Sequence, residues 1–213
     1  MKRFLAAVAA VLLAVAAHAQ VGVTVGLTSA SSDVKSVLTT VKSLNQYHLG
    51  LTCKIPVGLG FALQPSLLYD VKGSSLEDAT SGNVSFDTRT GYLELPVQLQ
   101  WGLDLPVLGR LYALGEPYVA YAVDMRTCSS AVANGDWQKV TSWDGINRLQ
   151  YGLGLGVGLE LFKHLQLTGR YYWDMGPLFN GDGSLTDITL KGIAKYITDG
   201  KNKGIKLSVS YLF

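Results

Sequence analysis

The chain has 213 residues, of which 48% are hydrophobic and only 16% are charged, and its formal net charge is +2. Soluble proteins carry about 25% charged residues and disordered chains are poor in apolar residues, so this composition excludes a disordered chain. The small net charge provides no electrostatic basis for binding nucleic acid.

The first 19 residues have the three parts of a secretory signal peptide. Lys2 and Arg3 precede an apolar stretch, which ends in the cleavage motif Ala17-His18-Ala19. An uncleaved membrane anchor is the alternative, but the apolar run is shorter than the roughly 20 residues that a spanning helix needs. We therefore expect residues 1–19 to be a signal peptide and residues 20–213 to form one domain.

Beyond residue 20, apolar and polar residues alternate with the period of two that is typical of β-strands. In the first such segment, Val21, Val23 and Val25 alternate with Gly22 and Thr24. The pattern predicts eight strands, at 21–28, 47–54, 61–72, 92–103, 111–126, 149–161, 165–175 and 205–213.

The connections between these segments alternate in length. Short turns are predicted at 55–58, 104–109 and 162–164, and long loops at 29–46, 73–88, 127–148 and 176–203. Outer-membrane barrels combine short periplasmic turns with long outer loops, and eight is their smallest strand number. The sequence therefore predicts an all-β fold, an eight-stranded antiparallel up-and-down transmembrane β-barrel, with both ends of the domain on the periplasmic side.

A secreted soluble barrel is the alternative fold. A soluble barrel has apolar side chains inside and charges outside. Here the apolar face carries almost no charge over eight strands, while the opposite face carries charges and many glycines. We therefore expect the apolar face to meet lipid and the charged face to line the interior.

Three prolines, Pro65, Pro96 and Pro117, lie inside predicted strands, where a closed sheet normally excludes proline. They fall at mid-height of three neighbouring strands. We expect β-bulges at these positions, with a local shift in which side chains face inward.

The predicted interior is charged, and buried charges have to be paired. We predict an ion network that plugs the barrel, with a narrow ion path or gate as the alternative. Asp70, Lys72, Asp124, Arg126 and Asp174 would lie nearer the outer rim. The glycines at 152–158 would leave either space for a large neighbour such as Tyr118 or Tyr172, or a small pocket. The network itself is predicted to consist of Lys54, Glu94, Glu116, Glu160, Arg170 and Lys206.

Aromatic residues flank the apolar band, as in the girdles of outer-membrane barrels. The predicted girdle includes Trp101, Trp173, Tyr211 and Phe213. Trp137 and Trp143 lie in a long loop, where they either pack the loop on itself or contact a ligand.

The sequence contains none of the motifs H-E-x-x-H, C-x-x-C, G-x-S-x-G or the P-loop. It therefore predicts no catalytic residue, no metal site and no cofactor. An enzyme site would lie at the outer rim near His48 and Asp174, although a single histidine there is more typical of a solvated strand end. Cys53 and Cys128 are predicted at opposite ends of the barrel, so we expect no disulfide between them.

Several stretches resemble the PorT-like outer-membrane β-barrel family, and the similarity covers nearly all of 21–213. The last residue, Phe213, resembles the signal that the barrel assembly machinery reads. The resemblance implies a location in the bacterial outer membrane; one branch of the family assists the assembly of a secretion system, and no residue assigns this chain to that branch. The similar stretches are 55–57, 63–69, 92–97, 115–119, 152–160 and 169–172.

These observations predict a non-enzymatic outer-membrane protein with a structural, surface-recognition or envelope-assembly role. A narrow pore or small-solute transporter is the alternative. The expected partners are outer-membrane lipid and, through Phe213, the assembly machinery. The sequence does not name an extracellular ligand or an envelope protein.

Overall fold

The computed structural model describes residues 19–29, 46–77, 85–106, 109–129, 138–139, 148–177 and 202–213. The predicted signal peptide, most of the long loops, and Trp137 and Trp143 lie outside these residues. No helix in these ranges is both long and apolar enough to cross a membrane.

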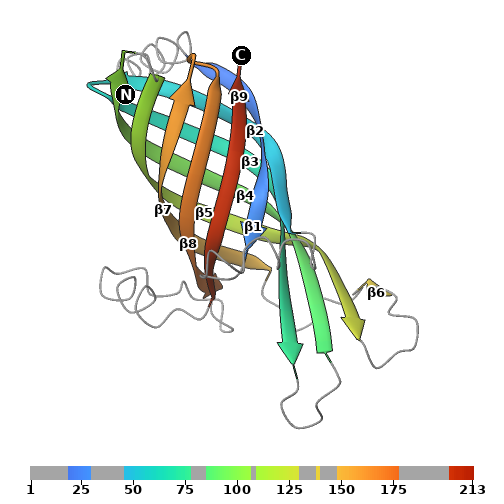
Figure 1. The fold of residues 1–213 in the computed structure, drawn as a ribbon. Helices are drawn as coiled ribbons and strands as arrows, with labels where there is room; N and C mark the ends of the chain where they lie inside the picture. The colour runs from blue at the N-terminus through green and yellow to red at the C-terminus, as the bar shows by residue number, and fades with distance from the viewer. Residues whose placement is uncertain are drawn as a thin grey trace, which may run out of the picture.

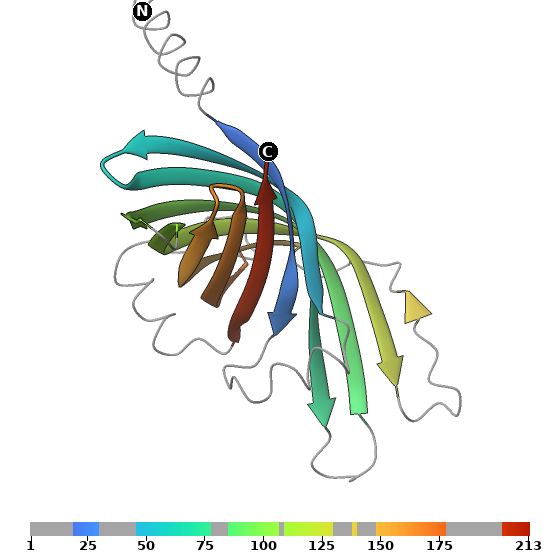
Figure 2. The same ribbon diagram turned by 45° about the horizontal axis from the view of Figure 1, so that its top comes forward.

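The fold is all-β and consists of one ring of eight long antiparallel strands (Figures 1 and 2). The ring runs β1–β2–β3–β4–β5–β7–β8–β9, and β9 pairs back with β1. Each of these strands therefore has two hydrogen-bonded neighbours, which confirms the predicted eight-stranded up-and-down barrel. The strands are β1 (Gln20–Ser29), β2 (Tyr47–Gly58), β3 (Phe61–Glu77), β4 (Ser85–Leu105), β5 (Gly109–Ser129), β6 (Gln138–Lys139), β7 (Leu149–Leu161), β8 (Leu165–Pro177) and β9 (Asn202–Leu212).

The side chains alternate between an apolar exterior and a polar interior. In β1, Val21 and Val25 are 55% and 56% exposed, whereas Thr24 and Thr28 are buried. Outward-facing valines and leucines continue this exposed apolar surface around the other strands. This is the reverse of a soluble barrel, and it suits a chain whose outer surface meets lipid acyl chains.

Short turns join the strands at the end where β1 begins and β9 ends (Figure 1). The turn at Phe162–His164 lies where the sequence predicts it. The predicted turn at 55–58 is wrong, because β2 continues to Gly58 and the chain reverses at Leu59 and Gly60. Both residues have positive φ (53° and 79°), which gives this hairpin a tighter connection than the sequence suggests.

The expected β-bulges at the three prolines are also wrong. The register is the same on both sides of each proline, so the alternation of inward and outward side chains continues past it. A proline removes a single N–H from the ladder, and the strands accommodate that loss without an extra residue. The cross-strand partners are Val97 for Pro65, Tyr118 for Pro96 and Leu153 for Pro117.

Three strands continue well beyond the ring and form a sheet arm, which we define as 73–77 of β3, 85–89 of β4 and 126–129 of β5 (Figure 1). The sequence predicts loops over much of this region. Its polar composition lacks the apolar alternation that marks the lower parts of the same strands. That alternation records contact with lipid on one side and a packed interior on the other, and a sheet outside the ring has neither.

Candidate functional site

The interior of the barrel is the most densely polar part of the described structure. Side chains from all eight ring strands fill it, in three layers between the short-turn end and the end that carries the arm. An eight-stranded barrel has an interior just wide enough for side chains to fill, so contacts between these layers decide whether anything can pass.

The layer nearest the short turns is built around Glu160. Lys54 donates to both carboxylate oxygens of Glu160 at 2.6 Å, and the Arg110 guanidinium lies 3.8 Å away. Arg110 also donates to the Gly60 carbonyl at 2.9 Å, across the strand end. One carboxylate thus holds two cations at the mouth on the short-turn end.

Four glutamine side chains connect this layer to the next. Gln166 donates to Glu160 at 2.9 Å, and Gln64 donates to Gln166 at 3.1 Å. The Gln100 amide nitrogen lies 2.9 Å from the side-chain oxygens of both Gln64 and Gln98. An amide offers donors and an acceptor together, so these glutamines join the two layers without adding charge.

The middle layer contains Arg170, which pairs with Glu116 and donates to the Ser208 hydroxyl at 2.7 Å. Gln98 donates to the same Glu116 carboxylate at 2.8 Å. The Ser208 oxygen lies 2.8 Å from His48 Nε2, which continues the network toward the outer end.

His48 is hydrogen-bonded through both ring nitrogens in this network. Thr28 donates its hydroxyl proton to Asp70 at 2.7 Å, and the Thr28 oxygen lies 2.9 Å from His48 Nδ1. His48 Nε2 lies 2.8 Å from the Ser208 oxygen, which accepts from Arg170. These hydrogen bonds connect Arg170 to Asp70 through His48.

The outer layer combines two lysines with carboxylates and tyrosines. Lys206 lies 2.6 Å from Glu94 and 2.9 Å from Asp70, and Lys72 lies 3.0 Å from Asp174 and 3.6 Å from Glu94. The Lys72 ammonium is also 5.0–5.3 Å from the centres of three rings, a distance at which cation–π attraction operates. These rings belong to Tyr92, Tyr118 and Tyr172.

The three layers form one continuous lumen network. Its described side chains include five cations and five carboxylates, and every one of them has an opposite charge within 4 Å. In the described residues, no group of His, Cys, Asp or Glu is arranged to hold a metal ion. The charged members are Lys54, Lys72, Arg110, Arg170, Lys206, Asp70, Glu94, Glu116, Glu160 and Asp174.

Aromatic rings fill the space that glycines leave in β7. A Cβ at Gly158 would collide with the Tyr112 ring, and one at Gly152 would collide with the Tyr118 hydroxyl. The sequence names Tyr118 as such a neighbour but not Tyr112. Tyr172 lies instead against Gly204 of β9.

The six predicted network residues are all buried and all belong to ion pairs: Lys54, Glu94, Glu116, Glu160, Arg170 and Lys206. Asp70, Lys72 and Asp174, which the sequence places nearer the rim, join the same network. Arg110 was missed because the predicted strand begins at residue 111, although Arg110 shares the inward parity of Glu116. The sequence did not single out the four glutamines, because the alternation of apolar and polar residues does not show which side chains hydrogen-bond to one another.

The view of His48 as a solvated strand end is wrong, because His48 is 1% exposed. Its two ring nitrogens are hydrogen-bonded to the hydroxyls of Thr28 and Ser208. Asp174, its predicted neighbour in an enzyme site, bonds instead to Lys72 and Tyr118.

A family model with the description "Outer membrane protein beta-barrel domain" matches residues 14–180. This chain belongs to the outer membrane protein beta-barrel domain family. Its location is the bacterial outer membrane, and its exposed apolar band is therefore the surface that meets lipid.

Two solved structures of outer-membrane proteins are similar to this outer-membrane barrel. Acinetobacter baumannii CarO2 is 13% identical, with a TM-score of 0.44, 91% of this chain covered and 98% of the other. A major outer membrane protein from Thermus thermophilus is 14% identical, with a TM-score of 0.37, 92% of this chain covered and 100% of the other. No curated protein shows significant similarity.

The aromatic residues predicted as a girdle lie on the outward face of this outer-membrane barrel. Trp101, Tyr211 and Phe213 are exposed at the short-turn end, and Trp173 lies toward the opposite end, against Tyr171. Their amphipathic rings suit the two membrane interfaces.

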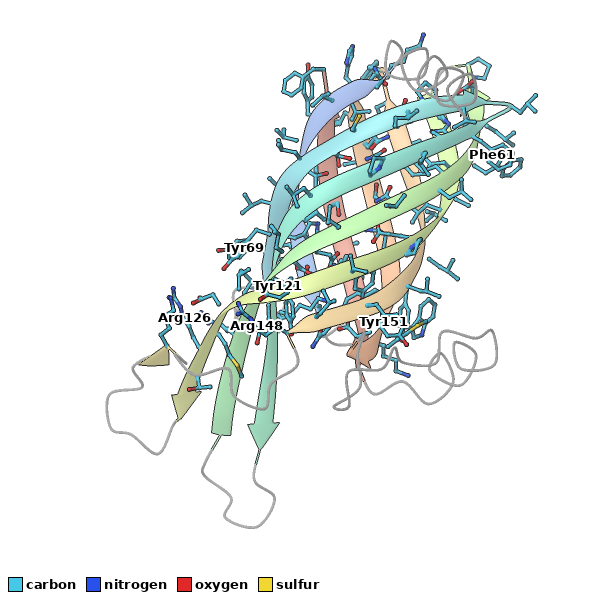
Figure 3. The ribbon with its side chains drawn as sticks, turned by 180° about the vertical axis from the view of Figure 1, so that it is seen from behind. Phe61, Tyr69, Tyr121, Arg126, Arg148 and Tyr151 are labelled. Atoms are coloured by element: carbon cyan, nitrogen blue, oxygen red, sulfur yellow. The ribbon has the colours of Figure 1, made fainter. Side chains whose placement is uncertain are left out.

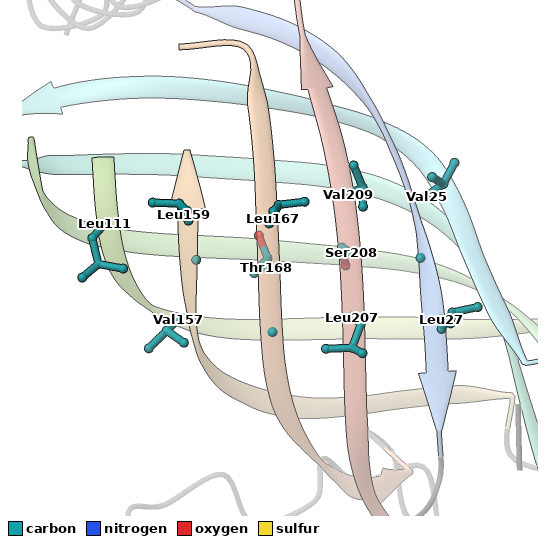
Figure 4. A pocket seen from close by; sticks show the side chains of 13 residues that line it. Val25, Leu27, Leu111, Val157, Leu159, Leu167, Thr168, Leu207, Ser208 and Val209 are labelled. Atoms are coloured by element: carbon teal, nitrogen blue, oxygen red, sulfur yellow. The ribbon is translucent and has the colours of Figure 1, made fainter. Parts of the chain in front are cut away.

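The lipid-facing wall has an apolar hollow of about 730 Å³ around Gly169 (Figure 4). Gly169 has no side chain to fill the wall between Val157 and Leu207, its two cross-strand partners. The hollow lies in the band that acyl chains cover, and its outward lining offers no polar group that would orient a substrate. The outward side chains are Val25, Leu27, Leu111, Val157, Leu159, Leu167, Leu207 and Val209.

Cys53 is a free, half-buried cysteine on β2. The side chain of Cys128 lies outside the described part, so the absence of a disulfide between them stays a prediction.

Proposed function

We propose that this chain is a non-conducting, non-enzymatic anchor in the outer membrane that presents its sheet arm for surface recognition or envelope assembly. The observation that carries the proposal is the lumen network, which runs without interruption from the Lys54–Glu160 pair at one mouth to the Lys72–Asp174 pair near the other. The family match supports the outer-membrane location and leaves the role open.

The energetics of the lumen network argue against passage of ions. An ion that crosses the middle layer has to separate Arg170 from Glu116, and breaking a buried pair costs several kcal/mol. Displaced side chains also have no empty volume to enter, because eight strands enclose only enough space for their own side chains. A narrow pore therefore needs a rearranged lumen.

The same geometry argues against catalysis at His48. A general base has to lie within hydrogen-bond reach of the proton that it removes. Both ring nitrogens of His48 are already bonded to Thr28 and Ser208 inside the packed lumen. A substrate has no route to either nitrogen without dismantling the network.

The sheet arm supports the recognition part of the proposal. It extends the barrel sheet beyond the ring on the side opposite the short turns (Figures 1 and 2). Long outer connections on a rigid barrel are where outer-membrane proteins place their binding surfaces.

Two finer assignments belong to this proposal and rest on the sequence. The motifs at 92–97 and 115–119 support membership of the PorT-like outer-membrane β-barrel family. Phe213 is 69% exposed at the end of β9, which leaves its ring accessible to the barrel assembly machinery. An extracellular ligand or envelope protein is the expected partner of the arm.

Conductance in planar lipid bilayers tests the closed lumen. We expect the wild-type protein to insert and show no current steps. Arg170→Ala combined with Glu116→Ala removes one pair and keeps the charge balance, and it should open a small conductance. Steps from the wild-type protein that change on Glu94→Gln would contradict the proposal and establish the pore instead.

A further inference from the structure

Two of the short turns carry large apolar side chains at their tips. Leu59, between β2 and β3, is 95% exposed, and Phe162, between β7 and β8, is 83% exposed. These are the two highest exposures among the large apolar side chains of the described residues. Tight turns favour glycine, proline, asparagine, aspartate and serine, so turn formation does not explain either residue.

The same two residues have a backbone conformation that large side chains avoid. Leu59 and Phe162 have φ angles of 53° and 54°, and Lys163, which follows Phe162, has 64°. Within the described ranges, these three are the residues other than glycine with positive φ. Asparagine or glycine would adopt this conformation at lower cost, and strained residues of this kind cluster at functional sites. Exposure and strain thus single out the same two tips.

The lipid-facing wall continues up to both tips. Val57, two residues before Leu59, is 67% exposed, and Phe61, two residues after it, is 42% exposed. Leu161, which has the outward parity of β7, directly precedes Phe162. Neither stretch has a charged residue between the wall and the tip. The tips are therefore continuous with the surface that meets acyl chains.

The height of the apolar wall indicates how far lipid reaches. Phe61 pairs with Trp101 at the short-turn end, and Tyr69 pairs with Leu93 at the other end, eight residues further along β3 (Figure 3). That interval spans about 26 Å along a strand, or about 20 Å across the membrane at the usual tilt of about 40°. The apolar band of outer-membrane barrels is about 25 Å tall, so about 5 Å is missing. The turn tips beyond Phe61 provide this height if they also lie in lipid.

A lysine follows one of the tips directly. Lys163 lies beside Phe162 in the same turn and is exposed. A lysine can lie with its stem along an apolar surface while its ammonium reaches the headgroup region. An aromatic ring next to a lysine is a combination that fixes membrane proteins at the interface.

We propose that Leu59 and Phe162 are membrane anchors that insert into the lipid leaflet at the short-turn end, at the edge of the acyl chains. Lipid contact of the two side chains offsets the cost of their backbone conformation, which explains why strained turns are retained. A protein partner is the other candidate for such tips, but continuity with the wall and the missing height favour lipid. The inference does not depend on whether the lumen conducts or on what the sheet arm binds.

Site-directed spin labelling tests this inference on the full mature chain in dioleoylphosphatidylcholine vesicles. In a background with Cys53→Ser and Cys128→Ser, a nitroxide is attached to Leu59→Cys or to Phe162→Cys. The measured quantity is the frequency of its collisions with oxygen, which concentrates among acyl chains, relative to a water-soluble nickel chelate. We expect both labels to collide preferentially with oxygen.

Two reference positions calibrate the measurement. Val157→Cys lies on the lipid-facing wall, where the native side chain is 63% exposed, and should report lipid. Lys139→Cys lies on β6 outside the ring, where the native side chain is 66% exposed, and should report water. Tip labels that match Lys139→Cys would overturn the proposal and assign the tips to a partner in water.

Replacement of the tips by asparagine gives a second test, in which the sign of the effect decides. Leu59→Asn combined with Phe162→Asn relieves the backbone strain but removes both apolar side chains. Tips in water should gain stability from the change, because asparagine tolerates positive φ. For tips in lipid, we expect the equilibrium constant for folding into dioleoylphosphatidylcholine vesicles to fall at least about tenfold. An unchanged or increased constant would contradict insertion.

Bilayer thickness supplies the matched control for the same variant. In the thinner bilayers of dilauroylphosphatidylcholine, the tips lie at or beyond the edge of the acyl chains, so the loss should be smaller. A loss of equal size in both lipids would show that the two side chains stabilise their turns through contacts within the protein. That result would also overturn the proposal.

Discussion

In the lumen, each described lysine and arginine lies against a carboxylate, whereas at the outer end of β5 Arg126 and Lys139 share Asp124 between them. The side chains of the lumen cations are at most 10% exposed, whereas those of the two rim cations are 57% and 66% exposed. Water stabilises an unpaired charge at the rim at little cost, but a buried unpaired charge costs several kcal/mol. The difference teaches that folding requires the lumen charges to be paired, whereas it tolerates two exposed cations that share one carboxylate at the rim.

The largest expected effect comes from removing one lumen cation. Lys206→Met keeps the length of the side chain but removes the ammonium group that pairs with both Asp70 and Glu94. Breaking a buried pair in this way should lower the free energy of unfolding by about 3–5 kcal/mol. Urea unfolding in lipid vesicles, followed by tryptophan fluorescence, measures the change.

A second variant keeps this test decisive if Lys206→Met does not fold. Adding Asp70→Asn and Glu94→Gln neutralises the carboxylates that the lysine served, so most of the lost stability should return. Wild-type stability of Lys206→Met alone would break the comparison, because it would mean that water solvates charges in the lumen as it does at the rim.

An intermediate effect is expected from filling the lumen further. Gly158→Ala forces a Cβ into the Tyr112 ring, which a 2.8 Å hydrogen bond to Thr168 holds in place. Overpacking of this kind should cost about 1–3 kcal/mol in the same unfolding measurement. Gly169→Ala is the control, because its Cβ would meet Leu207 on the lipid face at an ordinary 3.6 Å. Equal costs for the two variants would show that the lumen is no more tightly packed than the exterior.

The smallest effect on stability is expected at the rim. Arg126→Gln combined with Lys139→Gln removes two exposed ion pairs and some repulsion between like charges. The free energy of unfolding in phosphatidylcholine should change by less than about 0.5 kcal/mol. A loss of about 2 kcal/mol or more lies well outside the usual range for surface substitutions. It would mean that these cations hold the arm together and that the rim charges, like the lumen charges, are needed for stability.

Much of the barrel could be predicted because alternation is a local property of the sequence. Inward parity also places Glu94 and Arg170 in the lumen, where the structure has them buried. The prediction of strand boundaries failed where the sequence shows no alternation of apolar and polar residues. The arm lies outside the ring, and Arg110 is the second residue of β5, one residue before the apolar pattern becomes visible.

His48 shows the other limit of the sequence. Its position near a strand end indicates solvent, and nothing local to it reveals Thr28 or Ser208. Those hydroxyls come from β1, which pairs with β2, and from β9, which ring closure places on the far side of β1, so His48 is buried between them inside the ring.

The sequence by itself determined the period-two strands, their number, the lipid-facing parity and the long connections, because each depends on neighbours a few residues apart. Only the tertiary structure decided which lysine meets which carboxylate, which tyrosine fills which glycine gap, and that Arg89, Arg126 and Lys139 stand in one row. These contacts join residues from different strands, and the register that creates them is set by hydrogen bonding around the closed ring.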